Sequence, residues 1–327
     1  MGTTAAVLAL PFVVLGQATR RQRVVWLYEN SAGNSPEVRK RIADLLAARG
    51  FVEGRNLSLS FQTFPEGKED VEAFVKRLVD SAPDVIVRAP GRRGGWLPLL
   101  ARSTLDIPIV FYNLAADPAT VGLVETLRRP GGNITGATVD WNEIGTRQWQ
   151  LLKSFVPSMK RGGILREQEQ EYPTWEAAKQ ATDETNRRTE AQLGIEIREV
   201  SFRRGASEPE IALAISKARV DAVRVGLYPS ELTPEVIAAL KRTRVPACGS
   251  FFSQVKRGLL VCVTFDFSEG EAYAIDTVAR ILRGERPATI PVSKNTKYPV
   301  AVNRGTARAM GIEIPASILI QASEIFD

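Results

Sequence analysis

Short apolar runs alternate with longer amphipathic segments along most of the chain. The run VVWLYE at Val24–Glu29 predicts a buried strand, and a helical pattern follows it. Ser35 is placed to cap that helix, Pro36 to occupy its first position and Gly50 to end it. The next stretch, Leu57–Phe61, alternates apolar and polar residues as a half-exposed strand does. The chain therefore begins with a strand–helix–strand unit.

The same alternation continues and then restarts in a second half. Helical patterns span Glu143–Phe155 and Ser268–Leu282, and Thr233 with Pro234 begins another helix. After residue 282 we expect a stretch rich in proline and lysine, one more strand and a final short helix. The further predicted strands are Asp84–Pro90, Ile107–Asn113, Gly162–Glu167, Ile195–Phe202, Ala222–Leu227, Val245–Ser250, Leu259–Phe265 and Tyr298–Asn303.

This order of elements predicts the fold class. Strand–helix–strand alternation at this spacing implies right-handed crossovers and parallel sheets covered by helices on both faces. The pattern occurs twice, and 327 residues are too many for one ordinary compact core. We therefore expect an α/β protein with two Rossmann-like lobes, whose C-terminal tail crosses between them.

The composition narrows the classes of partner. Hydrophobic residues make up 44% of the chain and charged residues 24%, which is ordinary for a globular protein. The 43 basic and 37 acidic residues give a net charge of +6, with the two signs interspersed. This pattern favours a solvated mixed surface over a nucleic-acid-binding face. The short basic clusters are not interleaved with aromatic residues either, so we expect no nucleic-acid partner.

The residue types that are missing or rare exclude several chemistries. The chain has no histidine, which excludes Ser-His-Asp and Cys-His nucleophile systems and imidazole metal sites. Its two cysteines, Cys248 and Cys262, are too few for a structural zinc site. Both lie in apolar runs, so we expect buried strand thiols, with a disulfide between neighbouring strands as the alternative. No dinucleotide or phosphate-loop motif follows a strand, and we expect no cofactor.

The N-terminus has some features of an export signal. Ala5–Gly16 is an apolar stretch about as long as a signal-peptide core, and Gly16–Ala18 offers small residues for cleavage. Basic residues follow this stretch, whereas in a signal peptide they precede it. We expect that the sequence starts within a truncated signal peptide and that the protein is periplasmic. A buried N-terminal segment is the alternative.

Candidate ligand contacts follow from the predicted sheets. Small molecules bind to open α/β sheets beyond the carboxyl ends of the strands, so we expect one ligand between the two lobes. In the first lobe these positions, together with one near the expected crossing, are Tyr28, Asn30, Ser31, Arg88, Pro90, Gly91, Tyr112, Asn113, Asp117 and Thr135. In the second lobe they are Arg166, Tyr228, Ser230, Phe251, Phe252 and Asp266.

Several of these residues have a structural alternative. Capping is the first interpretation for two that precede predicted helices, Asp117 and Asp266. Phe251 and Phe252 cannot both face the same interior, so one of them is a candidate stacking surface. The Arg88 guanidinium must find an anion or water, and a structural ion pair and a ligand carboxylate are both open as its partner. Tyr112 suits a cleft wall, but it could equally pack under a loop.

Long stretches after residue 22 carry a recognisable pattern. The most specific is Ile107–Gly136, which contains DPATVGLVETLRRPGGNITG. Further stretches are RGFVEGRNLSLSF at Arg49–Phe61, DVIVRAPG at Asp84–Gly91, LLKSFVPSMKR at Leu151–Arg161 and the C-terminal run from ILRGERPATIPV onward. Together they resemble the ABC-transporter substrate-binding family that includes predicted tryptophan and tyrosine receptors.

The resemblance implies a fold and a mode of action. The fold is that of type I periplasmic-binding proteins, in which a cleft between two lobes closes by hinge bending. A monomeric receptor is then expected to deliver a small-molecule ligand to a membrane permease with its ATPase, without catalysis. The implied segments are a leader at 1–22, a first lobe at 23–136 with 267–295, and a second lobe at 137–266 with 296–327. The implied crossings lie near Thr135–Ala137, Asp266–Ser268 and Pro291–Tyr298.

The chain departs from the family where the ligand is expected. The loop APGRRGGWLP introduces Arg92, Arg93 and Trp96 where relatives carry small residues. The resemblance therefore transfers the fold but not the ligand. A more charged cleft favours an acidic or zwitterionic ligand with an aromatic part.

Two other classes of function stay open at this stage. One is an α/β enzyme with a carboxylate base such as Glu29 or Asp117, although the missing histidines and phosphate motifs weigh against it. The other is a ligand-sensing regulatory domain, although no DNA-binding helix-turn-helix precedes residue 23. A non-catalytic receptor is the leading hypothesis.

Overall fold

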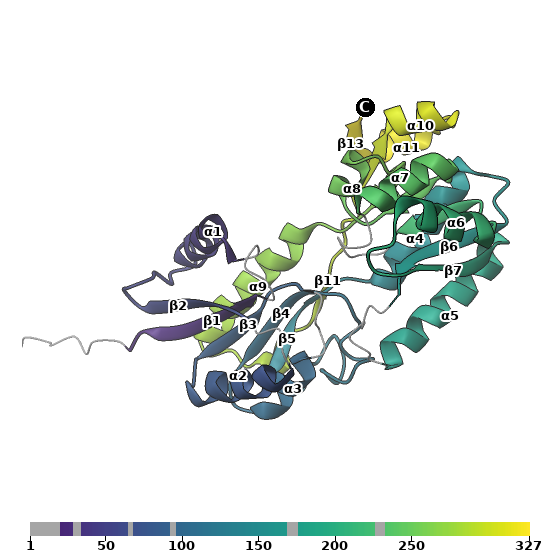
Figure 1. Ribbon diagram of the computed structural model, residues 1–327. Coiled ribbons are helices and arrows are strands. Elements are labelled where there is room, and N and C mark those ends of the chain that lie inside the picture. Colours follow the sequence, from purple (N-terminus) through teal and green to yellow (C-terminus); the bar gives the residue numbers. More distant parts are fainter. Residues whose placement is uncertain (1–19, 29–33, 65–67, 92–95, 169–175, 226–232) are drawn as a thin grey trace, which may run out of the picture.

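The computed structural model describes residues 20–28, 34–64, 68–91, 96–168, 176–225 and 233–327. The chain forms two lobes, each built on one β-sheet (Figure 1). The expected signal segment lies almost entirely outside the described residues. None of the helices in the described part of the chain has both the length and the apolar character that a membrane span requires.

The sheet of the first lobe has six strands in the order β11-β5-β4-β3-β1-β2, and all neighbouring strands are parallel. Its strands are β1 (Gln22–Tyr28), β2 (Leu57–Thr63), β3 (Val85–Arg88), β4 (Ile109–Leu114), β5 (Ile134–Thr138) and β11 (Ser293–Lys294). The helices of this lobe are α1 (Pro36–Ala47), α2 (Lys68–Asp80), α3 (Leu97–Ser103), α9 (Phe267–Leu282) and the short 3-10 helix Pro287–Thr289.

The sheet of the second lobe has seven strands in the order β13-β12-β10-β9-β8-β6-β7. Its strands are β6 (Arg161–Glu167), β7 (Glu196–Phe202), β8 (Ala222–Val225), β9 (Ala247–Gly249), β10 (Val261–Val263), β12 (Val300–Asn303) and β13 (Ala322–Phe326). Its helices are α4 (Trp141–Phe155), α5 (Glu176–Leu193), α6 (Glu208–Ala218), α7 (Pro234–Thr243), α8 (Phe252–Lys256), α10 (Arg304–Met310) and α11 (Ala316–Gln321). The predicted α/β fold class with two lobes of parallel sheet is confirmed.

Local sequence signals set several helix ends as predicted. The Ser35 side chain accepts a hydrogen bond from the Val38 amide at 3.4 Å and so caps α1. Thr233 caps α7 in the same way, accepting from the Val236 amide at 3.3 Å. Gly50 follows α1 with a φ of +92°, a conformation that glycine adopts without steric cost.

The C-terminal tail differs from the prediction. β11 lies in the stretch rich in proline and lysine, and it is only two residues long. Such a strand has no periodicity of its own, and it forms because its backbone pairs with β5. The predicted final short helix is in fact two helices and an edge strand. β12 also runs antiparallel to β10, because the chain returns to the second lobe from the opposite direction.

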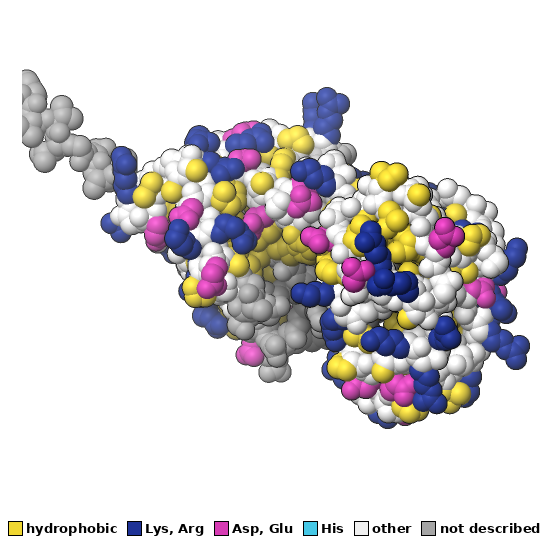
Figure 2. All heavy atoms as spheres, turned by 90° about the horizontal axis from the view of Figure 1, so that it is seen from above, with side chains coloured by type: hydrophobic (Ala, Val, Ile, Leu, Met, Phe, Trp, Pro, Cys, Tyr) yellow, Lys and Arg dark blue, Asp and Glu magenta, His cyan; other side chains and the backbone are white. Residues whose placement is uncertain are grey.

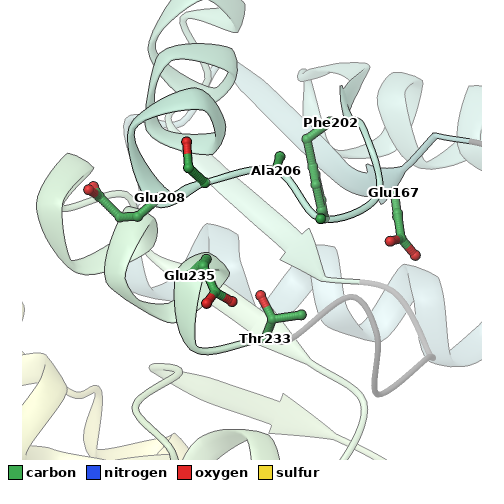
Figure 3. Close-up of a pocket in the computed structure, with 8 residues that line it drawn as sticks. Glu167, Phe202, Ala206, Glu208, Thr233 and Glu235 are labelled. Atoms are coloured by element: carbon green, nitrogen blue, oxygen red, sulfur yellow. The ribbon is translucent and has the colours of Figure 1, made fainter.

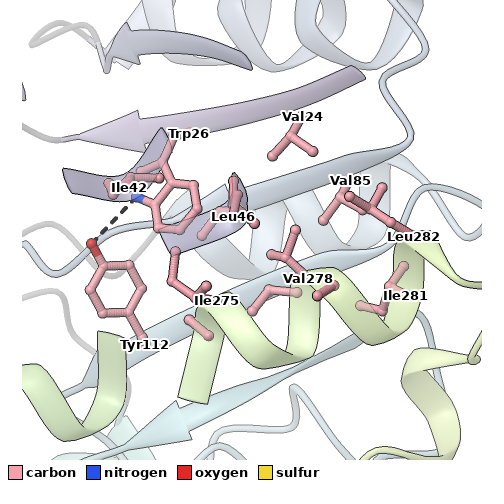
Figure 4. Packing of buried hydrophobic residues seen from close by; sticks show 14 of the residues in the cluster. Val24, Trp26, Ile42, Leu46, Val85, Tyr112, Ile275, Val278, Ile281 and Leu282 are labelled. Atoms are coloured by element: carbon pink, nitrogen blue, oxygen red, sulfur yellow. Dashed lines mark hydrogen bonds between the residues drawn. The ribbon is translucent and has the colours of Figure 1, made fainter. Parts of the chain in front are cut away.

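Buried apolar side chains cover both faces of each sheet. In the first lobe one such layer lies between the sheet, α1 and α9 (Figure 4). Trp26 and Val24 of β1 there face Ile275 and Val278 of α9. The two lobes have separate cores, so a substitution in one core is expected to act first on its own lobe.

The two cysteines are free and buried. Cys248 in β9 lies opposite Val261, so Cys262 is one residue further along β10 and points to the other face of the sheet. The two thiols accordingly belong to different core layers. This placement favours buried strand thiols over the disulfide.

We expect neither thiol to react with a water-soluble disulfide reagent in the native protein at mildly alkaline pH. Burial raises the pKa of Cys262 to about 12 and that of Cys248 well above its usual value, so the reactive thiolate is scarce. Both should react once the protein is unfolded in denaturant. Rapid native labelling of one thiol, followed by thiol counting, would show instead that the strands β9 and β10 open readily.

Candidate functional site

Three crossings of the chain join the lobes at the carboxyl edges of both sheets. β5 leads into α4 through residues 139–140, β10 into α9 through 264–266, and β11 into β12 through 295–299. Figure 1 shows β11 and the beginning of α9 between the two sheets, and Figure 2 shows two rounded lobes side by side. Because the strands before the first two crossings end here, the loops after the parallel strands lie next to this junction.

Two candidates of the first lobe, Tyr28 and Tyr112, lie in its core. The Trp26 indole Nε1 donates a hydrogen bond to the Tyr112 hydroxyl at 3.3 Å, and the two rings meet edge to face at 5.9 Å (Figure 4). Burial raises the pKa of Tyr28 to about 12 and that of Tyr112 well above its usual value, so both are neutral phenols. This placement favours the packing alternative for Tyr112.

Arg88 is the last residue of β3 and is only 1% exposed. Its Nη2 donates to the Gly91 carbonyl at 3.1 Å and thereby holds the turn that follows the strand. Pro90 in this turn is half-buried, and Gly91 is exposed. The guanidinium therefore has a structural role in the β3 turn, beside any contact it makes with a ligand.

Three candidates make hydrogen bonds either to neighbouring residues or to a segment that is distant in the sequence. The Asp117 carboxylate accepts from the amides of Ala119 and Thr120 at 2.9 and 3.1 Å, but it caps a turn and not the predicted helix. Asp266 caps α9, accepting from the Ser268 amide at 2.9 Å. The Thr135 hydroxyl is buried in β5, where it donates to the Ile290 carbonyl at 2.7 Å. Capping thus explains both aspartates, as the sequence favoured.

The remaining candidates divide between described and undescribed parts of the chain. Asn30, Ser31, Tyr228 and Ser230 lie outside the described residues. Arg166, at the end of β6, is partly exposed, with an Nη1 3.9 Å from the Glu199 carboxylate. Asn113 lies at the end of β4, and its side-chain amide bonds the backbone of α9 at Phe267.

The two adjacent phenylalanines, both half-buried, have different neighbours. Phe252 packs against the core of the second lobe. Phe251 instead approaches Phe267 at the start of α9, with ring centroids 6.0 Å apart. The loop that carries Phe251 is held by buried amides: Gln254 Oε1 accepts from the Phe251 amide at 3.0 Å, and Gln148 Nε2 donates to the Gly249 carbonyl at 2.9 Å.

A row of four aromatic rings crosses the junction, and the sequence predicted only one of them. Phe267 lies 4.2 Å from Phe265, and Phe265 meets Trp141 edge to face at 5.5 Å. Phe251, Phe267, Phe265 and Trp141 are named here the aromatic row. Phe265 is buried, whereas Phe267 keeps 46% of its surface exposed. The only sequence signal was the position of Phe267 directly after the cap Asp266.

A pocket of about 380 Å³ lies at the carboxyl edge of the second sheet (Figure 3). It lies beside the beginnings of α6 and α7, and its lining residues are Glu167, Phe202, Gly205, Ala206, Ser207, Glu208, Thr233 and Glu235. Two of its carboxylates have ion-pair partners: Glu167 with Arg204 at 3.4 Å, and Glu208 with Arg242 at 3.2 Å. Across the described ranges, no group of three or more carboxylates or thiols is placed to hold a metal ion.

Two α/β lobes that share three crossings have a fold similar to that of type I periplasmic-binding proteins. The chain matches the family described as ABC transporter substrate binding protein over residues 32–326, and it belongs to this family. The resemblance expected from the sequence is thus confirmed.

Related proteins with a described function or a solved structure agree with this family membership. A tyrosine-binding protein of Clostridioides difficile (strain R20291) is 23% identical over 284 residues, which cover 85% of this chain and 77% of that protein. A Streptococcus pneumonia ABC domain in complex with L-Trp superposes with a TM-score of 0.72 at 24% identity, covering 94% of this chain and 100% of that one. A conserved domain protein from Vibrio cholerae has the same TM-score and identity, with 94% and 99% covered.

Family membership decides the broad function. The members are non-enzymatic substrate-binding proteins of ABC transporters, so the enzyme hypothesis is wrong and the receptor hypothesis is confirmed. A small-molecule ligand, a transporter partner and a place of action outside the cytoplasm follow from the same membership.

Proposed function

We propose that the protein is a periplasmic receptor for an aromatic amino acid, which it delivers as a monomer to a permease and its ATPase. The observation that carries the ligand class is the aromatic row at the junction of the lobes. Its residue Phe267 is 46% exposed, although the centre of its ring lies only 4.2 Å from that of Phe265. An aromatic ligand would extend this row, since ring pairs stabilise each other beyond their buried area.

The names of two relatives support the same ligand class. The Clostridioides difficile relative is a tyrosine-binding protein, and the Streptococcus pneumonia structure contains L-Trp. A zwitterionic amino acid with an aromatic side chain is also among the ligands expected from the sequence. Of the loop residues behind that expectation, Trp96 is buried in the first-lobe core and stacks on Phe64, and Arg92 and Arg93 lie outside the described residues. The two lines of support are independent, because one comes from relatives and the other from the rings of this chain.

The position of the row suggests how binding would be coupled to closure. Phe267 begins α9 of the first lobe, whereas Phe251 lies in a loop of the second lobe. A ligand ring placed against both is contacted fully only when the lobes approach each other. Binding would therefore shift the population toward a closed form by the difference in contact free energy between the two forms.

The ligand class is tested by titrating the purified protein with L-tryptophan, L-tyrosine and L-phenylalanine, with L-leucine and citrate as controls. At about 100 times its dissociation constant, a true ligand stabilises the folded protein by roughly 2.7 kcal/mol, which a thermal-shift assay detects. We expect shifts with aromatic amino acids only. Binding of citrate or leucine alone would contradict the proposed ligand class and leave the family intact.

Phe267→Ala is expected to weaken binding of an aromatic amino acid about tenfold or more, because it removes the exposed face of the aromatic row. Isothermal titration calorimetry gives the affinities. Leu105→Ala is the matched control, since Leu105 is an 80% exposed apolar side chain that lies away from the junction in the loop before β4. Equal affinities of both variants and the parent protein would show that the row does not contact the ligand.

A further inference from the structure

Asn113 has an unusual backbone conformation at the carboxyl end of β4. Its φ is +48°, in the left-handed region where asparagine is one of the few residues tolerated. The register between β4 and β5 shifts between Phe111 and Leu114, so the strand is locally irregular there. The side chain is nonetheless well packed, with only 5% of the residue exposed. This conformation aims the amide away from the sheet ladder and toward the crossings.

The side-chain amide of Asn113 forms hydrogen bonds with residues at two of the three crossings. Its Nδ2 donates to the Phe267 carbonyl at 3.0 Å, at the crossing into α9. Its Oδ1 accepts from Asn295 Nδ2 at 3.2 Å, at the crossing after β11. The two asparagines are 182 residues apart in the chain.

Asn295 extends the network to the remaining crossing. Its backbone amide donates to the Thr138 carbonyl at 3.0 Å, at the end of β5. Its Nδ2 also donates to the Asp266 carbonyl at 2.9 Å. Asn295 is 3% exposed, and its Oδ1 has no hydrogen-bond partner among the described residues.

The first turn of α9 fits closely against this pair. A Cβ on Gly270 would collide with Asn113 Oδ1 and lie 3.3 Å from Asn295 Oδ1. One residue earlier, the Glu269 carboxylate accepts from the backbone amides of Thr296 and Lys297 at 3.0 and 3.2 Å. The third crossing is therefore fixed against α9 immediately after Asn295.

We propose that the Asn113–Asn295 pair is the anchor of the hinge. Its side-chain amides join the end of β4 to the residue that follows β11 and to the carbonyls of Asp266 and Phe267 at the start of α9. The Asn295 backbone amide adds the bond to Thr138 at the end of β5. The pair keeps these ends in register, and lobe rotation takes place beyond it, in residues 139–140, 264–265 and 298–299. Asn113 and Asn295 are positioning residues: they set the angles that the lobes can sample and do not contact the ligand.

Three variants disturb the anchor in different ways. Asn113→Gly keeps the left-handed backbone accessible but removes the amide, and Asn295→Ala removes the amide from the other side. Gly270→Ala removes no hydrogen-bonding group and displaces the pair sterically. Spin labels on cysteines introduced at the exposed Glu72 of α2 and Lys217 of α6 report the distance between the lobes without ligand. We expect all three variants to broaden the distance distribution of the ligand-free protein.

Asn303→Ala is the matched control. Asn303 is also 5% exposed, and it bonds the Val255 carbonyl at 3.0 Å within the second lobe. This variant should lower the melting temperature but leave the distance distribution as in the parent. If the anchor variants lose thermal stability as the control does and also keep the parent distribution, the pair is merely structural and the proposal is wrong.

A second readout rests on the proposed receptor function. If the fraction of molecules able to close falls tenfold, the apparent affinity falls about tenfold as well, although no ligand contact has changed. L-tryptophan is the probe, and the parent protein must bind it for this arm to apply. Failure of the parent to bind it would overturn the ligand class alone, because the ligand-free distances test the anchor independently.

Discussion

Gly136→Ala is expected to lower the free energy of unfolding by about 3 kcal/mol or more, from steric overlap and backbone strain together. Gly136 lies in the middle of β5 with a φ of +154°, which residues with a Cβ rarely adopt. It pairs with Phe111 of β4, and a Cβ would overlap the Phe111 carbonyl oxygen. Backbone cannot move aside as a side chain can. Thermal unfolding should show a melting temperature lower by roughly 6–12 °C.

Gly132→Ala is the matched control from the same sequence motif. A Cβ at Gly132 would meet no atom within 4 Å, and its φ does not lie in the range that excludes side chains. The free energy of unfolding of this variant should lie within about 0.5–1 kcal/mol of the parent value. A small increase is expected if the alanine makes the unfolded chain less flexible. If both alanine variants melted alike, the glycine at 136 would not be required by the close approach of β4.

Trp149→Ala is expected to lower the free energy of unfolding by about 3–5 kcal/mol, as substitutions of other fully buried aromatic residues do. Trp149 of α4 has no exposed surface, and its ring packs on the backbone of Gly162 in β6. The Arg224 guanidinium lies 5.8 Å from the centre of the same ring. Because the lobes have separate cores, hydrogen exchange should accelerate first in β6 and β8 and only later in β1 and β3.

A double-mutant cycle tests the contact between the Trp149 ring and Gly162 directly. A Cβ on Gly162 would lie 2.5 Å from the Trp149 ring, so Gly162→Ala alone should be strongly destabilising. In the Trp149→Ala background the added methyl group enters the vacated space, and most of this penalty should disappear. Urea unfolding of the four proteins gives the coupling free energy. Additive effects would contradict direct packing of the ring on Gly162.

The candidate site was predictable in part. The capping of α9 by Asp266 follows from local rules, and the structure agrees with it. Phe251 and Phe252 do have different neighbours, since Phe252 packs against the second-lobe core and Phe251 approaches Phe267. Asn113 was a reasonable ligand candidate from its position after a strand. Its bond to Asn295 was not predictable, because the partner lies 182 residues away in a stretch without an assigned element.

The aromatic row shows the same limit. Its four rings come from the start of α4, the loop after β9 and both sides of the crossing into α9. In the sequence, Trp141 and Phe267 are separate residues next to helix caps. Only the packing of the two lobes places their rings in one row, with Phe267 still exposed.

The sequence alone determined most of the helices, most of the strands, the two-lobed α/β class and the family. These depend on periodicity and capping within a few residues, or on motifs that are contiguous in the chain. The tertiary structure alone decided the order of the strands, the existence of β5, β11 and β13, and the convergence of three crossings on the asparagine pair. Those features depend on backbone groups and side chains that meet only after distant segments have packed, and no local pattern records such meetings.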